Sequence, residues 1–133
     1  MRKAKYRTAL LIDDSNIDNF INSEIIKSYN FVENTIIMDS PLQALNYMKR
    51  CLFTLSNIPD IIFLDLRMPE MSGFEFLNEL SKISGVLRAG FKVVILSASY
   101  DPTDLKLAKG NDLVTKFIHK PLNGEALEEL VVS

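Results

Sequence analysis

The chain has 133 residues, of which 47% are apolar and 24% charged, and its formal net charge is −2. This balance is typical of one globular domain with a substantial core and excludes an intrinsically disordered chain. Acids and bases are mixed along the chain, the single cysteine cannot form an internal disulfide, and no apolar run approaches membrane length. We therefore expect a cytoplasmic protein without a nucleic-acid or membrane partner.

The first predicted unit is a strand followed by a helix. Residues 8–13 (TALLID) form an apolar run that ends in an acid, which is typical of a buried parallel strand. Ser15 then predicts the cap of a helix, and Asp18 stands in the capping-box position. The apolar stripe of this helix is expected at Ile17, Phe20, Ile21 and Ile25.

A second strand is predicted over residues 34–39, and Ser40 and Pro41 mark the cap and first position of the helix that follows. Cys51 lies within the apolar pattern of that helix, so we interpret it as a packing residue. Residues 60–65 (DIIFLD) predict the third strand, which is the most apolar. Apolar residues then recur at helical spacing.

The last two units repeat this alternation. Residues 92–99 predict the fourth strand, and Asp101 precedes a fourth helix that ends at Gly110. Residues 115–120 predict the fifth strand, and Asn123 caps the last helix. Five strand–helix pairs predict an α/β fold: a doubly wound, five-stranded parallel sheet of flavodoxin-like order 2-1-3-4-5, with helices on both faces.

Chemically active side chains follow the strands of this predicted sheet. Asp13 and Asp14 end the first strand, Asp65 the third, Ser97 the fourth and Lys120 the fifth. In such sheets the ligand binds at the carboxyl ends of the strands, so these side chains are expected at one rim. Crowded carboxylates favour a hard cation such as Mg²⁺, and a lysine and a hydroxyl suit a phosphoryl group. The rim therefore predicts phosphoryl transfer, with a carboxylate as nucleophile.

Four motifs carry a resemblance to a known family. They are LLIDDS, IIFLDLRMPEMSGFEFL, VVILSAS and FIHKPL, and together they resemble the receiver domain of two-component response regulators over nearly the whole chain. The resemblance implies a single receiver domain over residues 1–133, without an output domain. Such a domain accepts a phosphoryl group from a sensor histidine kinase or a phosphotransfer protein and signals by contact with a downstream protein. It is a signalling domain that assists its own phosphorylation and dephosphorylation rather than an enzyme.

The resemblance also implies roles for individual residues. Asp65 is the expected phosphoacceptor, and Asp13, Asp14, Asp65 and the backbone carbonyl of Arg67 are the expected Mg²⁺ ligands. Lys120 is the expected lysine of the phosphoryl site.

Conformational switching is the second set of roles that the resemblance implies. Ser97 and Phe117 are the expected switch pair, although Phe117 has no hydroxyl group, and Pro121 is a candidate for a cis peptide. Arg67 and Ser99 flank the acceptor, at positions that tune dephosphorylation in this family. His119 is interpreted as a structural strand residue that points away from the neighbours of Phe117.

Three other functions fit the sequence less well. An aspartyl-phosphate phosphatase of the haloacid-dehalogenase type needs an acid two residues after its nucleophile, where this chain has Arg67. A pseudo-receiver that binds partners without phosphorylation is disfavoured by the full set of acids, Ser97 and Lys120. A dinucleotide-binding or P-loop enzyme is disfavoured because neither glycine-rich motif occurs.

Overall fold

A five-stranded parallel sheet in the order β2-β1-β3-β4-β5 forms the centre of the computed structural model, which describes residues 3–132. This confirms the predicted strand order. The strands are β1 (Tyr6–Ile12), β2 (Val32–Met38), β3 (Ile61–Leu64), β4 (Lys92–Ser97) and β5 (Val114–His119). The helices are α1 (Asn16–Ser28), α2 (Pro41–Thr54), α3 (Gly73–Ser81), α4 (Pro102–Lys109) and α5 (Gly124–Val132), with a 3-10 turn η1 (Val86–Ala89) before β4.

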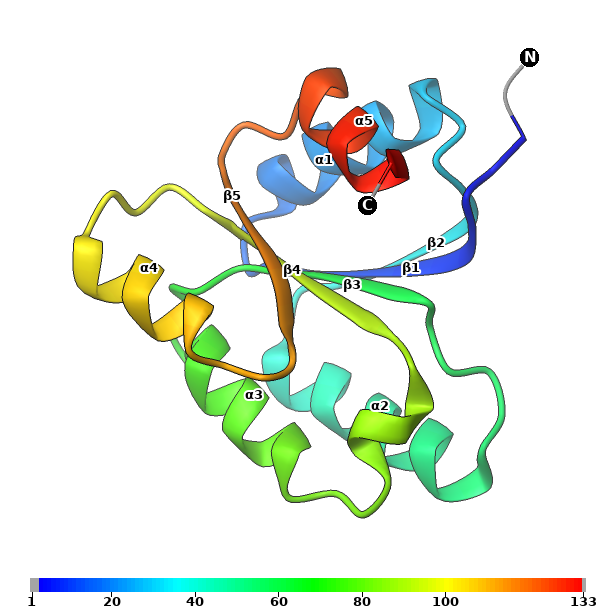
Figure 1. Cartoon of the computed structure of the whole chain (residues 1–133), viewed down its shortest axis with the longest axis vertical. Coiled ribbons are helices and arrows are strands. Elements are labelled where there is room, and N and C mark those ends of the chain that lie inside the picture. Colours follow the sequence, from blue (N-terminus) through cyan, green and yellow to red (C-terminus); the bar gives the residue numbers. More distant parts are fainter. Residues whose placement is uncertain (1–2, 133) are drawn as a thin grey trace.

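Helices cover both faces of the sheet. Figure 1 shows α1 and α5 on one face, and α2, α3 and α4 on the other. Each side has its own apolar core, and β3 contributes to both because all four of its side chains are buried. Burial on both faces explains why β3 reads as a continuous apolar run. Among the helices of residues 3–132, none is both long and apolar enough to cross a bilayer.

The apolar stripe predicted for α1 is wrong for most of its members. The exposed fraction is 72% for Ile17, 65% for Phe20 and 43% for Ile21. The buried residues of α1 are instead Asn19, Asn22 and Ile26. Periodicity fails here because the start of α1 packs against a polar rim rather than an apolar core, and Asn19 Nδ2 donates to the Asp13 carbonyl at 2.8 Å.

The capping box predicted for α1 is only half present. Ser15 caps the helix by accepting a hydrogen bond from Asp18 N at 3.1 Å. The Asp18 carboxylate, however, binds Lys120, and the Ser15 N–H donates to Asp13 Oδ1 at 3.0 Å. A complete capping box occurs instead at α3, between Ser72 and Glu75.

The loop after β3 turns back tightly onto its own strand. Gly73 N donates to Leu66 O at 2.9 Å, which closes the loop at the start of α3. A Cβ atom on Gly73 would lie 2.6 Å from the carbonyl oxygen of Asp65, so no larger residue fits without a backbone shift. This close approach fixes the backbone at Asp65.

Candidate acidic site at the carboxyl edge of the sheet

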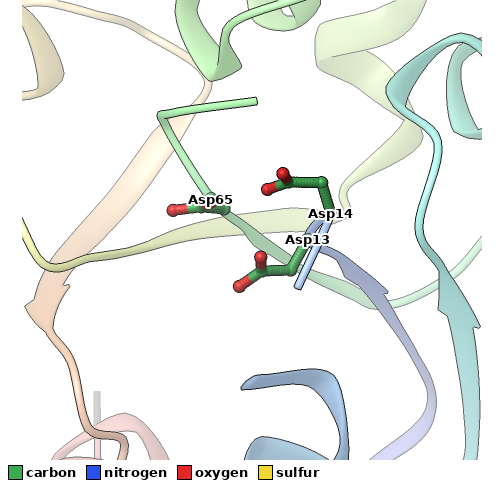
Figure 2. Close-up of side chains that lie close together, drawn as sticks. All are labelled: Asp13, Asp14 and Asp65. Atoms are coloured by element: carbon green, nitrogen blue, oxygen red, sulfur yellow. The ribbon is translucent and has the colours of Figure 1, made fainter. Parts of the chain in front are cut away.

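Three aspartates meet where β1 and β3 end. These strands are neighbours, with Ile12 in register with Leu64, and Asp65 N donates to Ile12 O at 3.0 Å. Asp13 and Asp65 are buried and Asp14 is exposed. One carboxylate oxygen from each of Asp13, Asp14 and Asp65 lies within 4.8 Å of the other two (Figure 2). The fold therefore brings together the three acids singled out in the sequence.

A lysine from the end of β5 reaches into this cluster. Lys120 Nζ lies 2.7 Å from Asp13 Oδ2, 2.7 Å from Asp18 Oδ2 and 3.4 Å from Asp65 Oδ1. The peptide bond between Lys120 and Pro121 is cis, and Lys120 N donates to Ser97 O at 2.9 Å. Burial alone would lower the pKa of Lys120, but its hydrogen bonds to Asp13 and Asp18 and the charge of Asp65 raise that pKa. Lys120 is therefore a permanent cation of the site.

The surroundings of Asp65 perturb its protonation. Burial and the charge of Asp13 raise the pKa of Asp65, while Lys120 and the backbone N–H of Leu66 oppose them, and the resulting pKa is about 6. The carboxylates thus carry more negative charge than one ammonium group offsets. An all-oxygen cluster with this excess charge fits a hard divalent cation such as Mg²⁺.

The hydroxyl of Ser97 lies at the end of the neighbouring strand. Ser97 is fully buried, and its Oγ accepts a hydrogen bond from Ser99 N at 3.0 Å. Because a hydroxyl that accepts one hydrogen bond still carries its own hydrogen, Ser97 retains the ability to donate.

Aromatic rings lie along β5 beyond the acidic cluster. Phe117 and His119 are in edge contact, with ring centroids 5.2 Å apart, and His119 stacks on Tyr100 at 4.3 Å. The prediction that His119 points away from the neighbours of Phe117 is therefore wrong. Residues two apart on a strand project from the same face, so alternation places these two rings side by side.

Two further acids of this region are not predicted as site residues by the sequence. Asp18 was assigned to a helix cap but binds Lys120, and Asp104 accepts hydrogen bonds from Arg67 Nη2 and Ser99 Oγ. Both acids lie in the first turn of a helix, where an acid is expected for the helix dipole alone. Lys120 is 102 positions from Asp18, and Arg67 is 37 positions from Asp104. No local sequence pattern therefore marks either pair.

Known proteins share this fold and sequence pattern. The chain is 30% identical over 122 residues to the probable methanogenesis regulatory protein FilR2 of Methanothrix harundinacea, covering 92% of this chain and 77% of that protein. It is 32% identical to a two component response regulator from Cytophaga hutchinsonii, whose crystal structure superposes with a TM-score of 0.85 over 98% of both chains.

A longer relative matches only in part. The protein-glutamate methylesterase/protein-glutamine glutaminase 2 of Chromobacterium violaceum is 27% identical over 130 residues, which are 93% of this chain but 34% of that enzyme. The chain thus spans about a third of the length of that enzyme. The family model named "Response regulator receiver domain" matches residues 9–132 of this chain. This chain belongs to the receiver domain family of two-component response regulators.

Proposed function

We propose that this receiver domain accepts a phosphoryl group on Asp65 from a histidine kinase or a phosphotransfer protein. An Asp65 carboxylate oxygen attacks the phosphorus of a phosphohistidine, the bond from phosphorus to the histidine nitrogen breaks, and an aspartyl-phosphate forms. The observation that carries the proposal is the position of Asp65: it is buried between Asp13 and Lys120, and its pKa is raised to about 6. At neutral pH most of Asp65 is still ionised and nucleophilic.

The carboxylates of Asp13, Asp14 and Asp65, with the backbone carbonyl of Arg67, would hold Mg²⁺ in this proposal. When bound, the cation supplies positive charge that offsets the charge of the phosphoryl oxygens. The close grouping of the three carboxylates supports this ligand set.

Lys120 and Ser97 are proposed to bind the phosphoryl oxygens. Lys120 Nζ already lies 3.4 Å from Asp65 Oδ1, so it provides a fixed positive charge beside the acceptor oxygen. Ser97 would donate its remaining hydrogen and move toward the phosphoryl group, with Phe117 following into the space that it leaves. Because Phe117 has no hydroxyl, its movement would be one of packing only.

The phosphodonor is proposed to dock on α1. This helix starts directly after the acidic cluster, and Ile17, Phe20 and Ile21 expose apolar surface along it. A protein that delivers a phosphohistidine to Asp65 must approach this rim, and exposed apolar side chains next to the rim offer it a contact surface.

The output surface is proposed on α4, β5 and α5. Tyr100 is 77% exposed and Leu107 53% exposed, and the stack of Tyr100 on His119 extends this surface. We further propose that the domain acts in the cytoplasm, through protein contact and without binding nucleic acid.

A phosphatase of the haloacid-dehalogenase type is less well supported. Its general acid would occupy position 67, and the arginine there forms an ion pair with Asp104. A pseudo-receiver is also less well supported, because Lys120 lies within ion-pair distance of both Asp13 and Asp65.

Phosphorylation by a small donor tests the proposal. The protein is incubated with acetyl phosphate and Mg²⁺, and its intact mass is followed. We expect a gain of one phosphoryl group that is stable in acid and lost in base. Asp65→Asn should abolish the gain, and a mutant that gains the group at the wild-type rate would refute the assignment of Asp65.

A further inference from the structure

A buried carboxylate on α4 joins the two loops beside the phosphorylation site. Asp104 is 5% exposed, and its Oδ2 accepts from Arg67 Nη2 in the loop after β3. The same oxygen accepts from Ser99 Oγ, at 2.7 Å, in the loop after β4. One atom therefore connects the first turn of α4 to both loops.

These contacts lead back to Asp65 through the chain and to the Ser97 hydroxyl. Arg67 lies two residues after Asp65, and Ser99 N donates to Ser97 Oγ at 3.0 Å. The Arg67 side chain is 67% exposed, so solvent leaves it room to turn away from Asp104. A change in charge at Asp65 thus has a short path to α4.

We propose that Asp104 is a positioning residue that holds Arg67 away from the acceptor, and that phosphorylation draws Arg67 from Asp104 to the phosphoryl group. This inference rests on the proposed phosphorylation of Asp65. An aspartyl-phosphate carries a charge of about −1.5 to −2 where the carboxylate carried −1, and it brings three acceptor oxygens, to which a guanidinium group binds with two parallel hydrogen bonds. The phosphoryl group therefore competes well for Arg67 with Asp104, which binds Arg67 through a single oxygen.

When Arg67 leaves Asp104, the first turn of α4 would be held less tightly. The Asp104 carboxylate then keeps its hydrogen bond from Ser99 Oγ, and the Ser99 N–H donates to Ser97 Oγ. This path carries the signal to the α4 surface without a hydroxyl group on Phe117.

The position of Arg67 also affects the lifetime of the phosphoryl group. In hydrolysis, water attacks phosphorus, the bond between phosphorus and the Asp65 oxygen breaks, and carboxylate, inorganic phosphate and a proton are released. A guanidinium group on the phosphoryl oxygens covers the approach of water. Because Asp104 competes for Arg67, removal of its charge should slow hydrolysis.

The test compares Asp104→Asn with Asp101→Asn. Asp101 is the N-cap of the same helix, accepts from Thr103 N at 2.9 Å and is exposed, and asparagine caps equally well. Each variant is loaded with acetyl phosphate and Mg²⁺, the donor is removed, and loss of the phosphoryl group is followed by intact mass. We expect a half-life at least about threefold longer for Asp104→Asn, as for loss of a modest ion pair, and no change for Asp101→Asn.

Two further measurements separate positioning from a merely structural role, and a third tests the link between Asp104 and α4. The effect of Asp104→Asn should vanish in an Arg67→Gln background, and Asp104→Glu should restore the wild-type half-life. In the unphosphorylated protein, amide hydrogen exchange of α4 should be faster in Asp104→Asn than in Asp101→Asn.

The inference is overturned if Asp104→Asn behaves like Asp101→Asn, or if its longer half-life persists without Arg67. Failure of the wild-type protein to gain a phosphoryl group would instead refute the proposed function, and the inference with it.

Discussion

At Asp65 the fold maintains an unfavourable charge at neutral pH. Burial and the charge of Asp13 raise its pKa to about 6, whereas an unfolded aspartate has a pKa of about 3.9. The folded state therefore binds more protons than the unfolded state between these two values. Stability consequently falls as pH rises through about 4 to 6, and the loss persists above that window.

Replacing Asp65 should therefore stabilise the protein. In the absence of divalent cations, Asp65→Asn is expected to raise the free energy of unfolding by about 2 kcal/mol at pH 7, because the perturbed carboxylate is gone. The gain should shrink toward zero near pH 4, where the wild-type carboxyl is also neutral. Urea unfolding at both pH values measures it, and an equal gain at both would contradict the assigned pKa.

Gly73 sets the backbone beside the acceptor. A Cβ there would meet the Asp65 carbonyl oxygen at 2.6 Å and Leu66 Cδ2 at 2.9 Å. Gly73→Ala is expected to cost about 2–4 kcal/mol of unfolding free energy and to slow phosphorylation, because the Asp65 backbone must move.

Gly124→Ala is the matched control. The three atoms nearest to its Cβ would all belong to the side chain of Tyr29, which is 40% exposed and can rotate away. We expect a cost below about 1 kcal/mol. Equal costs for both variants in urea unfolding would show that the contact with the Asp65 carbonyl is not the limiting feature.

Among the elements, the strands follow from the sequence more securely than the faces of the helices. The central strand β3 is buried on both faces, so its continuous apolar run is enough to predict it as a strand. The buried face of α1 carries Asn19 and Asn22, which local periodicity assigns to solvent. Their burial follows from the acidic cluster beneath them, which only the assembled sheet creates.

Substitutions on the two faces of α1 should separate effects on folding from effects on recognition of a partner protein. Phe20→Ala is expected to change the free energy of unfolding by less than about 0.5 kcal/mol, because its side chain is 65% exposed. It should slow phosphorylation by a partner protein but not by acetyl phosphate.

Ile26→Ala is the opposite case. Ile26 is fully buried in the core under α1, so its truncation is expected to cost about 2–5 kcal/mol. Phosphorylation of the folded fraction by a partner should be unchanged. A phosphotransfer rate for Phe20→Ala equal to the wild-type rate would remove α1 from the proposed docking surface.

For the whole molecule, parallel topology converts distant residues into one site. Lys120 contacts Asp13 across 107 positions because β5 and β1 both end at the same rim. The sequence predicts Asp13, Asp14, Asp65 and Lys120 at this rim, because the end of each apolar run marks the end of a strand. It does not predict Asp104 beside Arg67, because that contact depends on how α4 packs.

Cation binding should stabilise the whole fold. An ion that binds only the folded state adds about 2.7 kcal/mol at one hundred times its dissociation constant. We expect the melting temperature of the wild-type protein to rise with Mg²⁺ concentration. Asp14→Asn should lose most of this rise, because it removes one carboxylate of the cluster.

Asp112→Asn provides the control for charge alone, because Asp112 is an exposed acid outside the cluster. It should keep the wild-type response to Mg²⁺. Equal responses of the two variants would contradict a specific metal site.

The central claim is that Asp65 carries the phosphoryl group, and mapping the modified residue tests it most directly. The protein is treated with acetyl phosphate and Mg²⁺, the acyl phosphate is reduced with borohydride, and the peptides are sequenced by mass spectrometry. We predict that position 65 alone is converted to homoserine, and only when Mg²⁺ is present. Conversion at Asp13 or Asp14 in its place, or no conversion at any position, would contradict the account.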